Sequence, residues 1–154
     1  MEITVSRKAH FNAAHRLHNK EWSEKKNSQV FGKCNYPNYH GHNYELIVSV
    51  TGKINPDTGY VIDMGELKNI IKNEIEVRLD HKNLNLDVPY FSNVIPSAEN
   101  ICIYIAILNK MILRNGRLLG SDSVTIDFNN ASNEWRKNKI PYGEGMFYYI
   151  IDSK

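Results

Sequence analysis

The hydrophobic pattern changes along the chain from strict alternation to a helical repeat. Apolar and polar residues alternate over residues 2–16 and again from His42 to Thr51, which predicts two strands that each bury one face. From Met64 to Leu79 the apolar positions recur at intervals of three and four residues, which predicts an amphipathic helix. A chain with this change of pattern must pack a sheet against helices.

The remaining segments complete this pattern. Asp63 is expected to cap the first helix, and a second helix is expected to begin in PSAEN with Ser97 as its N-cap. Two more strands are predicted near residues 123–128 and 145–151, and the polar segment HNKEWSEKKNSQ is predicted to be an exposed loop. The order ββααββ favours an α+β fold, with one antiparallel four-stranded sheet and both helices on one face.

The composition is that of one ordinary domain over residues 1–154. The chain has 19 Lys and Arg against 17 Asp and Glu, and this net charge of +2 does not argue for nucleic acid. The longest apolar run, around Ile101 to Leu108, is shorter than the roughly 20 residues of a membrane span. The N-terminal segment lacks the apolar stretch of a signal peptide. Two cysteines make no disulfide framework, and the cytoplasm is the expected compartment. Cys102 lies in an apolar helical run and is expected in the core.

Two histidines, His40 and His42, flank Gly41 at the start of the second predicted strand. Residues i and i+2 of a strand project from the same face, so both imidazoles can reach one point. Such a pair suits zinc, but a catalytic zinc site usually has three protein ligands and one open position. The alternative is a pair of surface histidines with no metal.

The N-terminal strand offers three candidates for the third ligand. His15 shares a face with other inward positions of that strand, His10 faces the opposite way, and His18 lies in the polar loop. We therefore expect His15 to complete the set with His40 and His42.

A cysteine lies just before these histidines. Cys34 follows Lys33 in a loop, where nearby cations can lower a thiol pKa and make a thiolate base or nucleophile. Two alternatives stay open at this stage. Cys34 can be a small buried filler, or it can be a fourth ligand that closes the metal site.

Asp80 and His81 follow the first predicted helix in the segment RLDHKNLN. A carboxylate beside an imidazole can form part of a proton relay. The alternative is a structural role, because histidine near a helix C-terminus is favourable in any case.

Taken together, these segments resemble the 6-pyruvoyltetrahydropterin synthase family. The similar stretches occur in order from about residue 9 to residue 108, and they read FNAAHRL, FGKCNYPNYHGHNYELIVSVTG, NPDTGYVID, LDHKNLNLDVPYF and PSAENICIYI. The resemblance implies zinc (Zn2+) bound by His15, His40 and His42. It also implies a catalytic relay of Cys34, Asp80 and His81.

The resemblance further implies the tunnelling fold, in which subunits join edge to edge into trimeric barrels that stack as hexamers. Active sites then lie between subunits, so that Asp80 and His81 can serve the Cys34 of a neighbour. The implied reaction is that of a lyase of tetrahydrobiopterin biosynthesis. It converts 7,8-dihydroneopterin triphosphate to 6-pyruvoyltetrahydropterin and eliminates triphosphate.

Two alternatives to this reaction are kept. One is the sister enzyme 6-carboxytetrahydropterin synthase of queuosine biosynthesis, whose cysteine usually lies closer to the H-G-H motif than Cys34 lies to His40. The other is a relative that binds zinc or pterin without catalysis.

The sequence departs from the family pattern at the residue that would bind the pterin ring. Relatives carry a glutamate at the end of the third long strand, and regular alternation puts Phe128 at that place. A one-residue bulge would bring Asp127 into position instead. We predict Asp127 as the substrate-binding carboxylate, with Glu99 as a helper.

Overall fold

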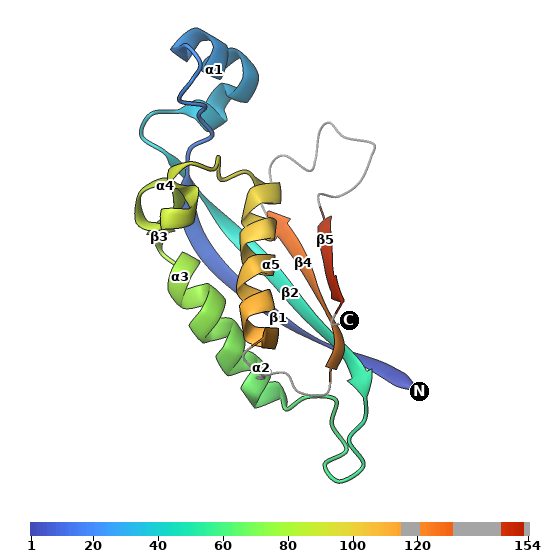
Figure 1. Ribbon diagram of the computed structural model, residues 1–154. Helices are drawn as coiled ribbons and strands as arrows, with labels where there is room; N and C mark the ends of the chain where they lie inside the picture. The colour runs from blue at the N-terminus through green and yellow to red at the C-terminus, as the bar shows by residue number, and fades with distance from the viewer. Residues whose placement is uncertain (115–120, 131–145, 153–154) are drawn as a thin grey trace, which may run out of the picture.

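One sheet runs through the chain, of which the computed structural model describes residues 1–114, 121–130 and 146–152, with side chains through residue 108. The strands lie in the order β3-β1-β2-β4-β5 (Figure 1). Their bounds are Glu2–His15 for β1, His40–Lys53 for β2, Lys82–Asn83 for β3, Ser121–Asn130 for β4 and Met146–Asp152 for β5. Neighbouring long strands are antiparallel, whereas β3 is parallel to β1.

The sheet therefore has five strands, and the expected number of four was wrong. The added strand is β3, where the chain returns after the first long helix to the edge of β1. The N–H of His81 donates to the carbonyl of Asn12 across 2.6 Å just before this strand. A strand of two residues leaves no alternating pattern, and its pairing partner lies far away in the sequence, so local periodicity could not reveal it.

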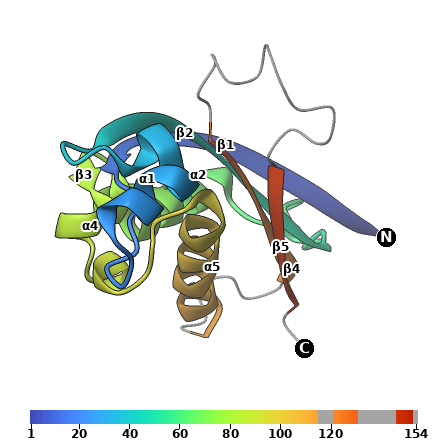
Figure 2. The same cartoon turned by 90° about the horizontal axis from the view of Figure 1, so that it is seen from above.

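Two long helices cover one side of the sheet, as Figures 1 and 2 show. The first comprises α2, a π-helical turn η2 and α3, and it matches the predicted range; the second is α5. The bounds are Met64–Ile71 for α2, Lys72–Glu76 for η2, Val77–Leu79 for α3 and Ala98–Arg114 for α5. Shorter helical elements are α1 at Glu24–Phe31, η1 at Gly32–Asn35, α4 at Leu84–Asp87 and η3 at Pro89–Ser92.

Both predicted N-caps are confirmed. The Oδ1 atom of Asp63 accepts hydrogen bonds from the N–H groups of Gly65 at 2.6 Å and Glu66 at 3.1 Å. The hydroxyl of Ser97 accepts from the N–H of Asn100 at 3.4 Å. These bonds satisfy N–H groups that the first turn of a helix leaves without a partner.

The polar segment is largely exposed, as predicted, but most of helix α1 lies in it, so the prediction of a loop was wrong. The hydroxyl of Ser23 caps the helix at the N–H of Lys26, and the amide of Asn27 is fully buried. Trp22 stacks on Phe31 with ring centroids 5.9 Å apart, and Lys26 lies over the Trp22 ring. Capping and contacts between a few side chains stabilise α1. Because these need no apolar stripe, the pattern by which a helix is recognised in a sequence is missing here.

The core lies between the helices and the sheet face that carries the odd-numbered residues of β1 and the even-numbered residues of β2. Tyr44, Leu46 and Val50 of β2 are completely buried there. All five apolar positions predicted for the first helix are buried, namely Leu67, Ile70, Ile71, Ile75 and Leu79. Each such side chain contributes about 1.5–3 kcal/mol on burial. Cys102 is also buried, as expected for a core position.

The opposite face of the sheet carries polar cross-strand pairs. The hydroxyls of Thr4 and Thr51 are 2.8 Å apart, and those of Ser6 and Ser49 are 2.7 Å apart.

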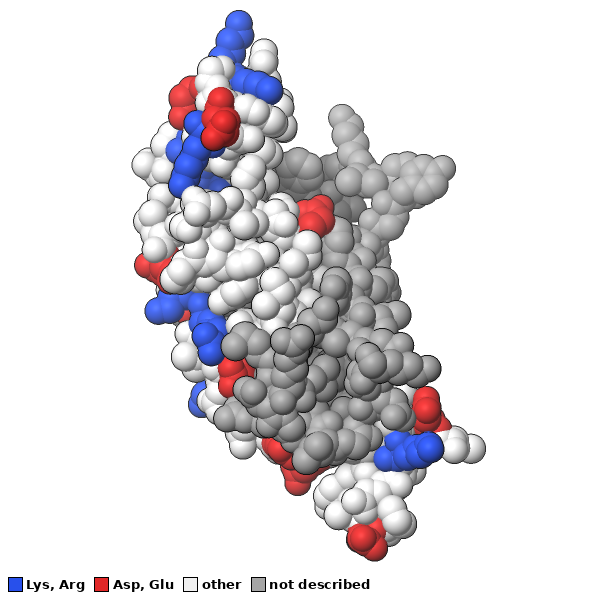
Figure 3. All heavy atoms as spheres, in the orientation of Figure 1, with Lys and Arg blue, Asp and Glu red and all other residues white. Residues whose placement is uncertain are grey.

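In Figure 3 the charged side chains of both signs are interspersed over α1 and the α2–α3 helix. Within the described ranges, no helix has the combination of length and apolar character that a membrane crossing needs. The assembly into trimeric barrels stays a prediction.

Candidate active site

Three histidines converge where β1 ends and β2 begins. The strand register pairs His15 directly with His40 and pairs Ala13 with His42. One ligand atom from each of the three histidines lies within 4.8 Å of the other two. The predicted ligand set is therefore brought together by the pairing of two antiparallel strands.

A hydrogen bond at the second ring nitrogen, Nδ1, fixes the orientation of the His15 imidazole. Its Nδ1–H donates a hydrogen bond of 2.6 Å to the carbonyl oxygen of Pro96, just before α5. Since a carbonyl can only accept, the proton sits on Nδ1, and Nε2 keeps its lone pair. That Nε2 atom lies 3.1 Å from Nε2 of His40.

The environment keeps these imidazoles neutral. Burial lowers the pKa of His15 from 6.5 to about 4; the Pro96 carbonyl offsets part of this effect, and His42 and His40 add to it. Burial also lowers the pKa of His40, and burial together with His40 lowers that of His42. Neutral imidazole is the form that binds a metal ion.

The geometry fits a zinc ion. Two nitrogens at tetrahedral positions around zinc are separated by about 3.3 Å, given Zn–N bonds of roughly 2.0–2.1 Å. The observed Nε2–Nε2 distance of 3.1 Å is close to that value. The hydrogen bond from His15 to Pro96 is the kind of outer contact that orients a metal-binding imidazole. The sequence reasoning did not identify Pro96, because this contact joins positions far apart in the chain.

Cys34 lies in the turn η1, and five residues separate it from the start of β2 at His40. Its thiol is half-buried, and burial raises its pKa. Burial is also the main cause that raises the pKa of the Tyr44 hydroxyl, and the charge of a Cys34 thiolate adds to it. Tyr44 in turn contacts the ring of His42, with centroids 5.8 Å apart. Cys34 is thus linked to the histidine centre through a buried tyrosine that the sequence reasoning counted only as a strand residue.

Asp80 and His81 form a pair at the outer edge of β1. The Nδ1–H of His81 donates to Oδ2 of Asp80 at 2.8 Å, and Oδ1 of Asp80 accepts from the N–H of Asn12 at 2.8 Å. Burial acts to raise the pKa of Asp80, but the hydrogen bonds from Asn12 and His81 outweigh it, and the pKa is lowered. The carboxylate therefore stays ionised and orients the imidazole.

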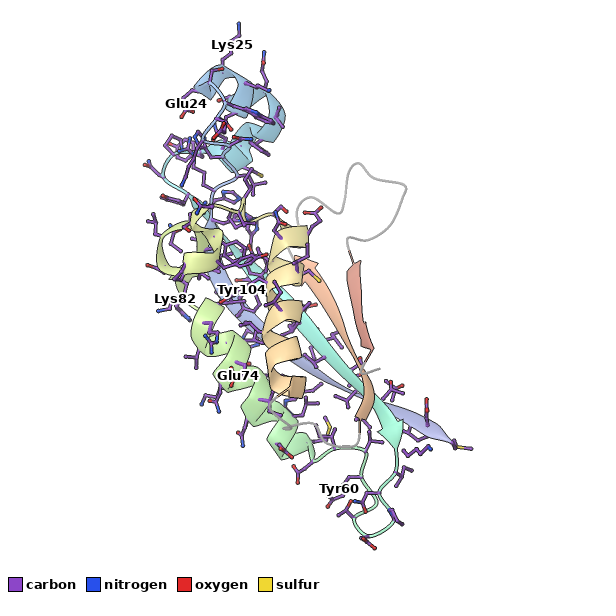
Figure 4. All side chains as sticks on the ribbon, viewed as in Figure 1. Glu24, Lys25, Tyr60, Glu74, Lys82 and Tyr104 are labelled. Carbon is purple, nitrogen blue, oxygen red and sulfur yellow. The ribbon has the colours of Figure 1, made fainter. Side chains whose placement is uncertain are left out.

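His81 has a backbone conformation that is uncommon for its residue type. Its φ of 57° lies in the left-handed region, and its side chain is 79% exposed. Such a conformation costs energy in a residue other than glycine, so it persists because the main-chain bond to Asn12 holds it. His81 directly precedes Lys82, whose side chain is labelled at the margin of the molecule in Figure 4.

A hollow of about 510 Å³ lies beside the edge pair, lined by residues of β1, β2 and β3. It is bordered by His42 of the histidine centre and by His81 of the edge pair. His15 and His40 do not line it, and by the strand register Asn12 and Asn43 belong to the sheet face opposite the three histidines, so the hollow does not join the two groups. Cys34 does not line this hollow, and no described hydrogen bond joins Cys34 to His81 in the same chain.

The two predicted pterin-binding residues are placed by the main chain. Glu99 is exposed in the first turn of α5, three positions after Pro96. Asp127 pairs with Ile47 and Phe128 with Leu46, in a register that is regular from Ser123 to Asn130. The one-residue bulge proposed at Asp127 is therefore absent, because the pairing with β2 continues without a shift. The role of Asp127 stays a prediction.

The fold and the site together define an α+β protein with a candidate three-histidine metal centre. The family model described as 6-pyruvoyl tetrahydropterin synthase matches residues 4–126. The human 6-pyruvoyl tetrahydrobiopterin synthase is 50% identical over 104 residues, which cover 68% of this chain and 72% of the human protein. A putative 6-pyruvoyl tetrahydrobiopterin synthase of Caenorhabditis elegans is 38% identical over 117 residues, which cover 76% of this chain and 83% of that protein.

A solved structure gives the same result for the fold. The 6-pyruvoyl tetrahydropterin synthase structure from Caenorhabditis elegans superposes with a TM-score of 0.75 and 33% identity, and covers 97% of this chain and 95% of its own. The chain belongs to the 6-pyruvoyl tetrahydropterin synthase family.

Proposed function

We propose that this protein is a zinc-dependent lyase that converts 7,8-dihydroneopterin triphosphate to 6-pyruvoyltetrahydropterin and eliminates triphosphate, a step of tetrahydrobiopterin biosynthesis. The observation that carries the proposal is the convergence of His15, His40 and His42 on one point. The names of the human and nematode relatives support the same reaction.

The three histidines would hold the zinc ion through one ring nitrogen each. The Pro96 carbonyl keeps the proton of His15 on Nδ1, so that Nε2 is available as a ligand. When bound, zinc supplies Lewis acidity that lowers the pKa of carbon-bound protons beside the coordinated hydroxyls of the substrate.

Cys34 would act as the base that removes such a proton. Burial raises the pKa of its thiol, so the proton must leave the sulfur before the group can act. A base with a raised pKa holds an abstracted proton more tightly, which favours removal from carbon.

His81 would exchange protons with the side chain of the substrate. The bond from Nδ1–H to Asp80 leaves Nε2 of His81 as the acceptor, on a side chain that is largely exposed. The exposure of His81 at an edge strand supports a site shared between subunits, in which Asp80 and His81 serve the Cys34 of a neighbour within a trimeric barrel or hexamer.

One observation favours the non-catalytic alternative. The regular register of β4 leaves Phe128 at the position where relatives carry the pterin-binding glutamate. The loop of five residues between Cys34 and His40 argues against the alternative of a 6-carboxytetrahydropterin synthase.

The test is incubation of the zinc-loaded protein with 7,8-dihydroneopterin triphosphate, followed by mass analysis of the pterin and quantification of triphosphate. The pyruvoyl product with an equal amount of triphosphate supports the proposal. The carboxy product would assign the sister activity, and an unchanged substrate would assign a binding role. The His42→Ala variant is the negative control, because it removes one ligand of the metal.

A further inference from the structure

The residue after Cys34 is a buried asparagine whose amide is completely used. Asn35 is 4% exposed. Its Oδ1 accepts from Nε of Arg16 at 3.2 Å and from Nδ1 of His18 at 2.9 Å. Its Nδ2 donates to Oε2 of Glu24 and to Oγ of Ser28, both at 3.4 Å. An amide has two acceptor sites and two donors, and all four are occupied here.

These four bonds join separate parts of the structure. Arg16 and His18 belong to the segment that follows β1, whereas Glu24 and Ser28 lie on α1, where Figure 4 labels Glu24. Asn35 itself ends η1. The amide therefore holds η1 against both segments at once.

The main chain around Cys34 is bound to the same segment. The carbonyl of Cys34 accepts from the N–H of Leu17 at 2.9 Å, and the carbonyl of Asn35 accepts from Nε of Arg16 at 2.8 Å. Arg16 directly follows His15. The turn that carries the thiol is thus attached to the strand end that carries a metal ligand.

The segment that follows the end of β1 is itself held in place by Asn85. The side chain of Asn85 accepts from the N–H of Arg16 at 2.8 Å and donates to its carbonyl at 3.0 Å. Because Asn85 holds Arg16, the hydrogen bonds from η1 to Arg16 also restrict the movement of η1.

We infer that Asn35 is a positioning residue for Cys34: its amide sets the orientation in which η1 presents the thiol to the histidine centre. The inference rests on the proposed role of Cys34 as base. An amide is needed because an aspartate could keep the bonds from Arg16 and His18 but could not donate to Glu24, whose carboxylate would repel it.

The chain offers a matched control in Asn27. This asparagine is also completely buried, and its amide donates to the carbonyls of Asn19, Trp22 and Ser23. These bonds hold α1, but none of them reaches η1. Asn27→Ala therefore removes a buried amide from α1, whereas the hydrogen bonds of the turn that carries Cys34 stay in place.

The experiment compares Asn35→Ala and Asn27→Ala with the wild type in three measurements: kcat and KM for dihydroneopterin triphosphate, the rate of Cys34 alkylation by iodoacetamide, and the melting temperature. Peptide mass analysis assigns the alkylation to Cys34. In Asn35→Ala we expect kcat to fall roughly 10- to 100-fold with KM unchanged, because a displacement of about 1 Å can have this effect. Alkylation should become at least about threefold faster, because the thiol is less confined. Asn27→Ala should lower the melting temperature only.

Equal changes of kcat and alkylation in the two variants would overturn the inference and leave a structural role. Unchanged kcat and alkylation in Asn35→Ala would overturn it as well. If Asn35→Ala does not fold, Asn35→Asp replaces it, and wild-type values in that variant would be equally decisive against the inference.

A wild type without turnover would contradict the proposed function, but the alkylation comparison would still decide the position of the thiol. Faster alkylation in the Asn35 variant alone would support the inference in that case, and equal alkylation rates would overturn it.

Discussion

The Nδ1–H of His15 donates to the carbonyl oxygen of Pro96 across 2.6 Å, which turns Nε2 of His15 toward His40 and His42. We therefore expect His15→Ala, His40→Ala and His42→Ala each to lower the zinc content, measured by elemental analysis of the purified protein, and to abolish turnover. His10→Ala is the control, because His10 is an exposed residue of the same strand. A full complement of zinc in His15→Ala would contradict the assignment.

Cys34→Ala should retain zinc and substrate binding but lose kcat by a factor of roughly 10² to 10⁴, the usual contribution of a general base. Steady-state kinetics and metal analysis of the same preparation test this expectation. Loss of zinc together with the thiol would instead make Cys34 a fourth ligand, and the proposed proton transfer would fail.

The metal-free protein should lose stability in acid. The folded chain keeps His15 neutral down to a pKa of about 4, whereas the unfolded chain takes up a proton near 6.5. As the pH falls through this window, protons bind to the unfolded state only, so the free energy of unfolding decreases by up to about 3 kcal/mol. His40 and His42 contribute with the same sign. Urea unfolding after zinc removal, at pH 7, 6 and 5, measures the decrease.

The His15→Gln variant should show a shallower dependence of the unfolding free energy on pH in the same experiment. His10→Gln should keep the wild-type slope. A free energy of unfolding that stays constant between pH 7 and 5 in the wild type would refute the expectation.

Asp63→Ala should lower the free energy of unfolding by about 1 kcal/mol, because the N–H groups of Gly65 and Glu66 lose their acceptor. Asp63→Asn is the matched control, since its amide oxygen can still accept these bonds. Asparagine matches aspartate in size, so an equal loss of unfolding free energy in the two variants would show that the cap bond contributes nothing.

Asp127→Asn should raise the KM for the pterin substrate strongly and leave the zinc content unchanged if Asp127 binds the amino-pyrimidine edge through two parallel bonds. Glu99→Gln should have a smaller effect of the same sign. Kinetics identical to wild type in Asp127→Asn would reject the residue as a substrate ligand.

The parts of the fold that local sequence determines were predicted well. The helix over residues 64–79 follows from an apolar stripe and a capping carboxylate, and both are present. Helix α1 was missed because Asn27 and the Trp22–Phe31 pair stabilise it without such a stripe. The pairing of His40 with His42 in the histidine centre was predictable because alternation alone puts them on one face of the strand.

Contacts between distant segments could not be predicted. Strand β3, the bond from His15 to Pro96 and the network around Asn35 each join positions that no local pattern connects. The regular register opposite Ile47 likewise depends on pairing with another strand, so a bulge at Asp127 could be proposed but not decided from sequence.

The attachment of Asp80 and His81 to Asn12 has a consequence for the spacing between this edge pair and the histidine centre. Asn12 and His15 belong to one continuous strand, and three residues of extended chain span about 10 Å. The strand works as a spacer of fixed length between the edge pair and the histidine centre. Changes in the loops that connect the helices therefore leave this spacing intact, whereas an insertion or deletion of one residue between Asn12 and His15 would alter it and turn His15 to the other face of the sheet.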